Sequence, residues 1–390
     1  MTLKQGQFLY VIMIELQNVL MELMNDSKMK MNKYVKYLIM MLAFVSCDGR
    51  KPASDANICL DFSKCVDDTL NVSDWMYPLE IVRLETTEES LLGSVDKLVE
   101  YNENYYVLDK MRNCVLVFDG TGNFLRRVGR VGQGPGEYST LSDFIVDEKT
   151  GCLYLLANSS TVYAYDNEGS FLWKKKVSDS LLWNIGIDES DFVCSSNHLT
   201  YTSGKDAFLI YRFNEDFQEK DRSVEVFKEQ LYSPLLISNP FQKWNGNSYY
   251  IDAFFNIVYS LSDEKVIPYC EFKFTSPIPV EYFSNAGLLM EHQRRYDFVK
   301  EAFFSKEYLW VSYIHSGKHR TAIVEMASRD IIGNGETRGM FPKVYQSGES
   351  LLSPISTEDY LRFWTYLDGM LKQPVSIEDN HLILKWKIKE

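Results

Sequence analysis

Short apolar runs broken by Gly, Asn, Asp and Ser recur along most of the chain, which is the pattern of β-strands joined by turns. Two stretches, residues 115–125 and 162–172, are near copies that begin 47 residues apart. Each contains an apolar run, a polar turn that ends in Gly and a second apolar run. A strand-built repeat of about 40 to 50 residues is typical of a β-propeller blade. The pattern therefore predicts a ring of such blades.

The number of strand runs predicts the number of blades. Five complete groups follow one another between residues 98 and 332, and a final run covers residues 381–387. We expect N-terminal strands at residues 58–62 and 79–84 to complete a sixth blade with this final run. Joining both ends of the chain in one blade would close the ring and remove exposed sheet edges. The predicted fold is all-β: a six-bladed β-propeller with four-stranded blades.

Two stretches depart from the strand pattern and predict helices. Residues 281–304 place several apolar side chains on one face of a helix. Residues 357–371 follow Ser356, an N-cap residue type, with Asp359 three positions later. We expect both helices as loop insertions in blades five and six, where insertions on one face of the ring would shape a binding surface.

The N-terminal residues have the pattern of a targeting segment. A basic stretch at residues 31–36 precedes an apolar run at 37–45, and Ser46 and Cys47 follow, as in a secretory signal. The run is too short to cross a bilayer of about 30 Å as a permanent helix. The Cys after a small residue resembles the lipobox of bacterial lipoproteins, which implies cleavage before Cys47 and diacylglycerol on its thiol. An ordinary signal peptide with a coincidental Cys is the alternative.

This segment also sets the expected domain organisation. Met31 is so well placed as the start of the signal that residues 1–30 look like an upstream extension, and we assign residues 1–46 to extension and signal together. Residues 47–57 are small and polar, which favours a flexible tether. The propeller would occupy residues 58–390. The expected location is the cell envelope, with the chain anchored to a bacterial outer membrane on its periplasmic or surface face.

Charge and cysteine content narrow the function classes. The net charge of −13 argues against nucleic-acid binding and against docking on anionic lipid through a basic face. Apart from Cys47, six Cys remain, and most lie in apolar runs where a free thiol acts as a small buried hydrophobe. Cys59 and Cys65 are close enough in sequence to pair in an oxidising compartment. No C-x-x-C pair occurs, which argues against a structural zinc site.

A Gly-rich segment, residues 129–138, joins the two repeat copies. Together with the strand pattern of residues 141–147, 153–155 and 162–166 and the turn at Gly169, it resembles an NHL repeat. More narrowly, the chain resembles six-bladed propeller lipoproteins of Gram-negative bacteria. The resemblance implies an exported, surface-facing propeller, and it supplies no catalytic residues.

The Gly-rich segment first raises the question of phosphate binding. It lacks both nucleotide-binding spacings, and no helix follows whose N-terminus could hold an anion. We therefore interpret it as a turn between blades. Its polar side chains would lie on one rim of the ring, where binding residues concentrate, with inter-blade hydrogen bonding as the alternative role. The candidate ligand contacts are Arg127, Arg130, Gln133, Glu137 and Tyr138.

Metal binding has two weaker candidates, and no other cofactor is expected. Acidic residues at strand ends could line the channel and hold Ca²⁺, although Asp in turns also bonds its own backbone. His315 and His319 flank a predicted hairpin turn and could share a metal, but no third ligand is evident. An exposed polar turn is the alternative for this pair. The acidic candidates are Asp109, Asp147, Asp166 and Asp188.

We expect a binding or interaction module, because a propeller fold carries no chemistry of its own. Its partner would be a saccharide, a peptide or an envelope protein, held on the rim formed by the inter-blade loops and the two insertions. The protein would be a monomer or part of an envelope complex. The alternatives are a hydrolase or lyase with Ca²⁺ in the central channel and an assembly scaffold. No G-x-S-x-G elbow supports a serine hydrolase.

Overall fold

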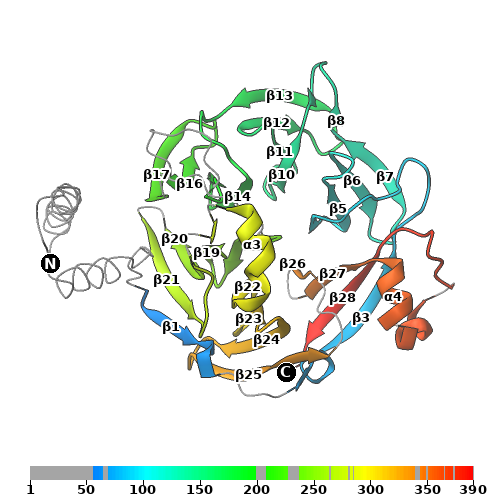
Figure 1. Ribbon diagram of the computed structural model, residues 1–390. Helices are drawn as coiled ribbons and strands as arrows, with labels where there is room; N and C mark the ends of the chain where they lie inside the picture. The colour runs from blue at the N-terminus through cyan, green and yellow to red at the C-terminus, as the bar shows by residue number, and fades with distance from the viewer. Residues whose placement is uncertain are drawn as a thin grey trace, which may run out of the picture. The chain divides into compact units, whose positions relative to one another are not determined.

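The computed structural model shows a ring of six small β-sheets within residues 51–390 (Figure 1). The targeting segment, Cys47, most of the tether and Cys65 lie outside the described residues. No helix of the described part has the length and apolarity needed to span a membrane. The structure describes residues 56–64, 69–198, 208–226, 237–262, 265–279, 282–283, 285–338, 343–347, 350–363, 365–371 and 374–389.

The first three blades are four-stranded antiparallel sheets of consecutive strands. Blade 1 contains β4 (Lys97–Tyr101), β5 (Asn104–Asp109), β6 (Cys114–Asp119) and β7 (Phe124–Val128). Blade 2 contains β10 (Leu141–Val146), β11 (Leu153–Ala157), β12 (Thr161–Tyr165) and β13 (Phe171–Lys176). Blade 3 contains β14 (Asn184–Asp188), β15 (Asp191–Ser195), β16 (Phe208–Phe213) and β17 (Glu219–Glu225).

Segments from the N-terminal part of the chain join the other three blades. Blade 4 contains β18 (Phe241–Trp244), β19 (Asn247–Asp252), β20 (Ile257–Leu261), β21 (Val266–Lys273) and β1 (Ile58–Asp61). Blade 5 contains β22 (Phe298–Ser305), β23 (Tyr308–His315), β24 (Lys318–Glu325), β25 (Asp330–Arg338) and β2 (Thr69–Asn71). Blade 6 contains β26 (Tyr345–Ser347), β27 (Ser350–Ile355), β28 (Leu382–Ile388) and β3 (Met76–Arg83).

Burial along the strands reflects the stacking of blades against one another. The middle strands β6 and β15 are buried along almost their whole length, because each blade packs between two neighbours and both faces of its sheet meet apolar side chains. The outermost strand β17 is mostly exposed. The hydrophobic core is therefore a set of layers between blades rather than one central cluster.

Strand β3 closes the ring. It pairs antiparallel with β28, from Met76 opposite Ile388 to Arg83 opposite Leu382. This pairing confirms that an N-terminal strand near residues 79–84 completes the sixth blade with the C-terminal strand. The ring then has no interruption between its first and last blades, which protects the sheet edges there.

The expectation that residues 58–62 belong to the sixth blade is wrong. Strand β1 pairs in parallel with β21 of blade 4, and β2 pairs in parallel with β25 of blade 5. The chain thus contacts the outer edges of two blades before it enters the sixth. The sequence of such a short segment predicts that a strand forms but not which sheet edge it joins, because its backbone groups can form hydrogen bonds with any open edge.

The second predicted helix is confirmed, and the first is shorter than predicted. α4 (Thr357–Phe363) and η5 (Thr365–Met370) lie between β27 and β28, and α4 begins after Ser356, whose Oγ accepts from Asp359 N at 3.1 Å. In the other stretch, only α3 (Ala286–His292) and η4 (Gln293–Arg295) are helical. Residues 298–304 belong instead to β22, because a short buried apolar run fits either a helix or a strand.

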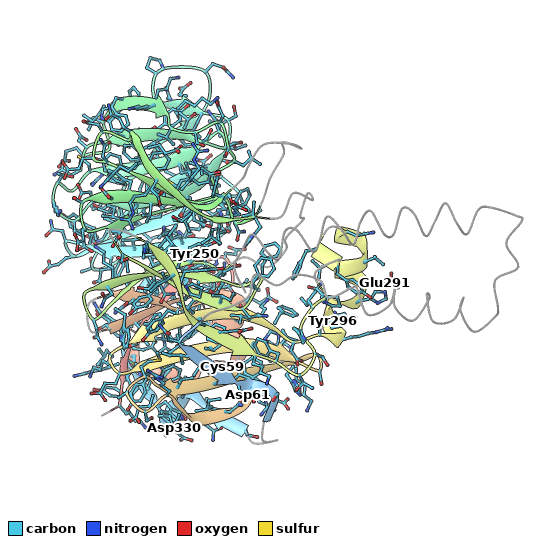
Figure 2. All side chains as sticks on the ribbon, turned by 90° about the vertical axis from the view of Figure 1, so that its left-hand side faces the viewer. Cys59, Asp61, Tyr250, Glu291, Tyr296 and Asp330 are labelled. Carbon is cyan, nitrogen blue, oxygen red and sulfur yellow. The ribbon has the colours of Figure 1, made fainter. Side chains whose placement is uncertain are left out.

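The two insertions enter the ring at different places. α3 lies in the connection from blade 4 to blade 5, and α4 lies inside blade 6. Seen from the side, α3 projects away from the sheets, with Glu291 and Tyr296 well outside the ring (Figure 2). Two short 3-10 turns, η1 (Phe62–Lys64) and η2 (Val72–Asp74), complete the described helical elements.

Candidate functional site: a polar cavity at the channel mouth

A cavity of about 980 Å³ lies at one end of the central channel. Its wall is formed by residues from all six blades, because the innermost strands of the blades begin at this face. Many lining residues lie at or just before those strand starts, and others lie in loops that connect the second and third strands. Representative side chains from successive blades are Lys97, Asp143, Trp183, Ser238, Glu301 and Lys343.

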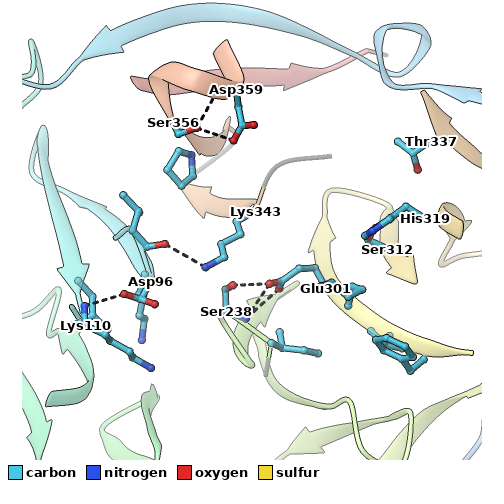
Figure 3. A pocket seen from close by; sticks show the side chains of 18 of the residues that line it. Asp96, Lys110, Ser238, Glu301, Ser312, His319, Thr337, Lys343, Ser356 and Asp359 are labelled. Atoms are coloured by element: carbon cyan, nitrogen blue, oxygen red, sulfur yellow. Dashed lines mark hydrogen bonds between the residues drawn. The ribbon is translucent and has the colours of Figure 1, made fainter. Parts of the chain in front are cut away.

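Both helical insertions contribute to the same cavity. Gln293 of η4 and Asp359 of α4 line it, together with Ser356, the N-cap residue of α4. In the capping arrangement, the Ser356 hydroxyl also donates to Asp359 Oδ2 at 2.7 Å (Figure 3). The insertions therefore lie on the face where the cavity opens and add polar groups to its rim.

A buried ion pair forms part of the wall. Lys97 Nζ of blade 1 donates to Asp143 Oδ1 of blade 2 at 2.9 Å and to the carbonyl oxygen of Phe144 at 2.7 Å. The second carboxylate oxygen of Asp143 accepts from Ile185 N of blade 3 at 3.0 Å. Three blades are thus joined by one carboxylate, and these groups hold the wall rather than face a ligand.

A second carboxyl group in the wall is held by a serine. Glu301 accepts from the Ser238 hydroxyl at 2.5 Å and from Ser238 N at 3.1 Å (Figure 3). Burial raises the pKa of Glu301, and the bonds from Ser238 together with the charges of Lys343 and Lys300 oppose that rise. The site therefore contains a carboxyl group that is harder to ionise than an exposed glutamate.

Three lysines that line the cavity form no ion pair with a carboxylate of the described residues. Lys110 Nζ lies 5.3 Å from the centroid of the Trp183 ring, and Lys343 Nζ donates to the carbonyl oxygen of Val95 at 3.3 Å. Lys300 lies exposed on β22. Desolvation lowers the pKa of Lys110; Asp143 and Asp96 oppose this effect, and the positive charges of Lys97 and Lys343 add to it.

Two histidines also line the cavity. Burial lowers the pKa of His381, and desolvation together with the charge of Lys300 lowers the pKa of His319. His315 is elsewhere: its Nδ1 lies 3.0 Å from Asp297 Oδ1. The hairpin between β23 and β24 places His319 opposite Ile314 rather than opposite His315. The two histidines of the predicted metal pair are therefore in different surroundings.

The four predicted acidic ligands are not brought together. Asp109 accepts from backbone N–H groups of the loop at Gly93 and of Arg112, and Asp147 and Asp166 bind backbone N–H groups in their own turns. Asp188 pairs with Arg212 Nη1 at 2.7 Å. Within the described ranges, no group of three His, Cys, Asp or Glu side chains is placed to hold a metal ion.

The Gly-rich segment lies at the outside of the ring, where β8 (Arg130–Val131) pairs in parallel with β9 (Glu137–Tyr138) beside β13 (Figure 1). Arg130 Nε is 2.6 Å from Glu137 Oε1, and Glu137 Oε2 accepts from Gly134 N at 2.7 Å. These bonds, first that from Gly134, lower the pKa of Glu137. The segment is thus a tightly bonded connection between blades 1 and 2.

The remaining predicted contacts of this segment divide into buried and exposed residues. Tyr138 is buried in the core, and its hydroxyl donates to the carbonyl oxygen of Asn113 at 3.0 Å. Arg127 and Gln133 are exposed. None of the five predicted contacts lines the channel cavity. A ligand role for the exposed members of this set stays a prediction.

Sequence reasoning missed the cavity, although a signal for it exists. Lys97 and Asn184 are the first residues of the innermost strands of blades 1 and 3, and Asp143 is the third residue of the innermost strand of blade 2. A polar residue near the beginning of an apolar inner strand, found in successive blades, marks side chains that line the channel. The near-identical repeat covers only the outer strands of the blades, so the candidate contacts predicted from it lie in an outer connection between blades.

Comparison with known proteins gives a family and a fold. The chain matches a family described as a domain of unknown function, DUF4934, over residues 57–384. Among solved structures, it is similar to a candidate exported protein from Bacteroides fragilis, with 16% identity, a TM-score of 0.65 and coverage of 85% of this chain and 100% of that chain. It is also similar to a DUF4221 member from Bacteroides vulgatus, with 10% identity, a TM-score of 0.54 and coverage of 80% and 98%.

Identities this low show the shared fold alone, and no curated protein matches the chain. The family match, in contrast, begins just before β1 and ends within β28, so that it includes strands of every blade. Blades 1 to 5, the closing strand β3 and most of blade 6 fall inside the matched region, and the chain belongs to the DUF4934 family.

Proposed function

We propose that this protein is an exported, lipid-anchored propeller that binds a saccharide in the cavity at the channel mouth. The observation that carries the proposal is the cavity itself: about 980 Å³, lined by side chains from every blade and by both insertions. Sites for small molecules have volumes of roughly 300 to 1,000 Å³ and combine apolar surface with a few placed polar groups. A folded protein partner would instead require a broad contact surface.

The lining favours a saccharide within this size class. Trp183 is partly exposed, and its ring can pack against the apolar face of a sugar. Asn184 follows it in the chain, and Ser312 lines the same cavity with a hydroxyl group that both donates and accepts. An aromatic ring beside amide and hydroxyl groups matches the alternation of C–H and O–H groups on a sugar ring.

The binding proposal is tested with a truncation of the aromatic ring. A glycan array first identifies a glycan that the unaltered protein binds, and calorimetry on the full chain in detergent then measures its affinity. Trp183→Ala is expected to bind this glycan at least about tenfold more weakly, which corresponds to about 1.4 kcal/mol. The matched control is Trp173→Ala on the outer strand β13, which is expected to keep the affinity. Equal binding by both variants would place the ligand outside the cavity.

Export and anchoring are proposed on the pattern of residues 31–47, which lies outside the described part of the chain. The structurally similar Bacteroides fragilis protein is itself described as a candidate exported protein. The NHL-like character of the blades belongs to the same proposal and rests on the paired segments at residues 115–125 and 162–172. A lipid on Cys47 would keep the propeller at the membrane while its cavity faces an aqueous compartment.

The anchor has a direct test. Cys47→Ser removes the thiol that would carry the lipid, so the variant is expected to move from the membrane fraction to the soluble fraction of the cell envelope. Fractionation followed by immunoblotting measures the change, and Cys59→Ser serves as the control because Cys59 lies within the propeller domain. A Cys47→Ser protein that stays fully in the membrane fraction would contradict lipid attachment at this residue.

A further inference from the structure

We infer that the saccharide is acidic and that its carboxylate groups are held by the amines of Lys110, Lys300 and Lys343. The inference rests on the proposed function, because it names the chemical class of the ligand for the same cavity. It follows from the charges that line the cavity and from which of them already have partners.

The carboxylates of the lining are already occupied. Asp143 is paired with Lys97 and Glu336 with Lys318, at 2.9 and 2.8 Å. The Asp96 carboxylate accepts a hydrogen bond from the backbone N–H of Lys110 at 2.9 Å. The side-chain amine of Lys110 takes no part in this bond. As described above, Glu301 and Asp359 are bonded to serines.

The three amines, in contrast, have no ion pair with a described carboxylate. Within the part of the chain that the structure describes, the one hydrogen bond from these three side chains is the long one from Lys343 Nζ to the carbonyl oxygen of Val95. Lys110 Nζ faces the Trp183 ring, and Lys300 lies exposed on the innermost strand of blade 5. A cationic amine that is partly removed from water, as that of Lys110 is, gains most from an anionic hydrogen-bond acceptor, and no described residue supplies one.

The amines act on one shared space. Lys343 lies between Lys110 with Asp96 on one side and Glu301 with Ser238 on the other (Figure 3). Desolvation lowers the pKa of Lys110, and the positive charge of Lys343 adds to this effect; together with Lys300, Lys343 also favours the charged form of Glu301. The lining contains as many carboxyl groups as lysines, and two of its lysines, Lys97 and Lys318, are already in ion pairs, so the other three amines are the cations left to pair with an anionic ligand.

The distribution of the amines favours several separate charges on the ligand over one compact anion. Lys110 follows β5 in blade 1, Lys300 lies on β22 in blade 5, and Lys343 precedes β26 in blade 6. Amines that come from three blades approach the cavity from different directions. A chain of uronate residues carries one carboxylate per sugar ring and places the charges apart, whereas a single phosphate concentrates them at one point.

Calorimetry on the full chain in detergent tests the inference with four probes: trigalacturonate, maltotriose, triglutamate and a κ-carrageenan tetrasaccharide, which carries sulfate groups and no carboxylate. Trigalacturonate is expected to bind at least tenfold more tightly than each of the others, and its affinity should fall as salt is raised. Lys110→Gln, Lys300→Gln and Lys343→Gln are each expected to weaken it about three- to tenfold, because each removes one charge-assisted hydrogen bond. Lys273→Gln, an exposed lysine at the end of the outer strand β21, is the control.

The outcomes separate the inference from the function on which it rests. Maltotriose binding as tightly as trigalacturonate would overturn the acidic ligand and leave saccharide binding intact. Tighter binding of the sulfated tetrasaccharide, which has no carboxylate, would overturn the assignment of carboxylate, and tighter binding of triglutamate would replace the saccharide by a peptide. If neither these saccharides nor any member of a glycan array binds, the proposed function itself fails. Thermal unfolding of each lysine variant confirms that its ring is intact.

Discussion

Replacing Lys97 by methionine is expected to lower the free energy of unfolding by about 3–5 kcal/mol, the usual result of leaving one member of a buried ion pair without its partner. Lys97 and Asp143 are only 5% and 3% exposed, and their charged atoms are 2.9 Å apart. Methionine fills a similar volume but cannot donate. The carboxylate of Asp143 would then keep only the backbone N–H groups of Phe144 and Ile185. Urea denaturation followed by tryptophan fluorescence measures the loss.

Two further variants identify the cause of that loss. Lys97→Met combined with Asp143→Leu removes both charges and should recover part of the stability, although the N–H groups of Phe144 and Ile185 then lose this acceptor, at a cost of about 1–3 kcal/mol each. Lys176→Met breaks an exposed pair with Asp179 and should cost at most about 1 kcal/mol. If Lys97→Met were no more damaging than Lys176→Met, the pair between blades 1 and 2 would not contribute to holding the ring.

Substituting alanine for Gly122 is the second change with a large expected effect. Gly122 adopts a φ of +92°, and a Cβ atom built there would lie 2.1 Å from the backbone oxygen of Arg83. Arg83 ends the closing strand β3, and Glu85 N donates to the Gly122 carbonyl oxygen at 2.8 Å. We expect a loss of about 2–4 kcal/mol, which combines about 1–2 kcal/mol for the left-handed backbone with the displacement of the closing strand.

Gly246 provides the matched control for this substitution. It lies in the turn between β18 and β19, has a φ of +75° and would have no atom within 4 Å of an added Cβ. Gly246→Ala should therefore cost only the backbone term, about 1–2 kcal/mol. The difference between the two variants, measured by the same urea denaturation, isolates the contact between blade 1 and the closing strand. Equal losses of unfolding free energy in the two variants would show that the closing strand accommodates the added Cβ without any loss of stability.

The repeated segments were predictable because each is a local unit. Residues 115–125 contain most of β6, its turn and the start of β7, and residues 162–172 contain the corresponding parts of β12 and β13. In both copies the turn is built around an Asp whose N–H donates four residues onward, to Asn123 in blade 1 and to Ser170 in blade 2. Neighbouring residues determine such turns, so the sequence pattern reveals them.

The strand β22 and the strands β1 and β2 show the limit of that logic. The apolar run at residues 298–304 fits a helix as well as a buried strand, and its position between β23 and the channel decides the matter. Strand β1 has apolar residues suited to any sheet edge, and it joins blade 4 because the ring presents that edge to it. The edge that β1 joins therefore depends on residues distant in the chain.

The amino-acid sequence alone predicted the propeller, the number of its blades and the closure by terminal strands. These features depend on the alternation of strands and turns, which neighbouring residues determine. The candidate site was decided only by the tertiary structure. Lys110, Lys300 and Lys343 lie far apart in the sequence and come to one cavity because six blades form a closed ring. Whether a lysine has a carboxylate partner depends on the distance between the two side chains in the folded protein. The sequence around each lysine does not determine that distance.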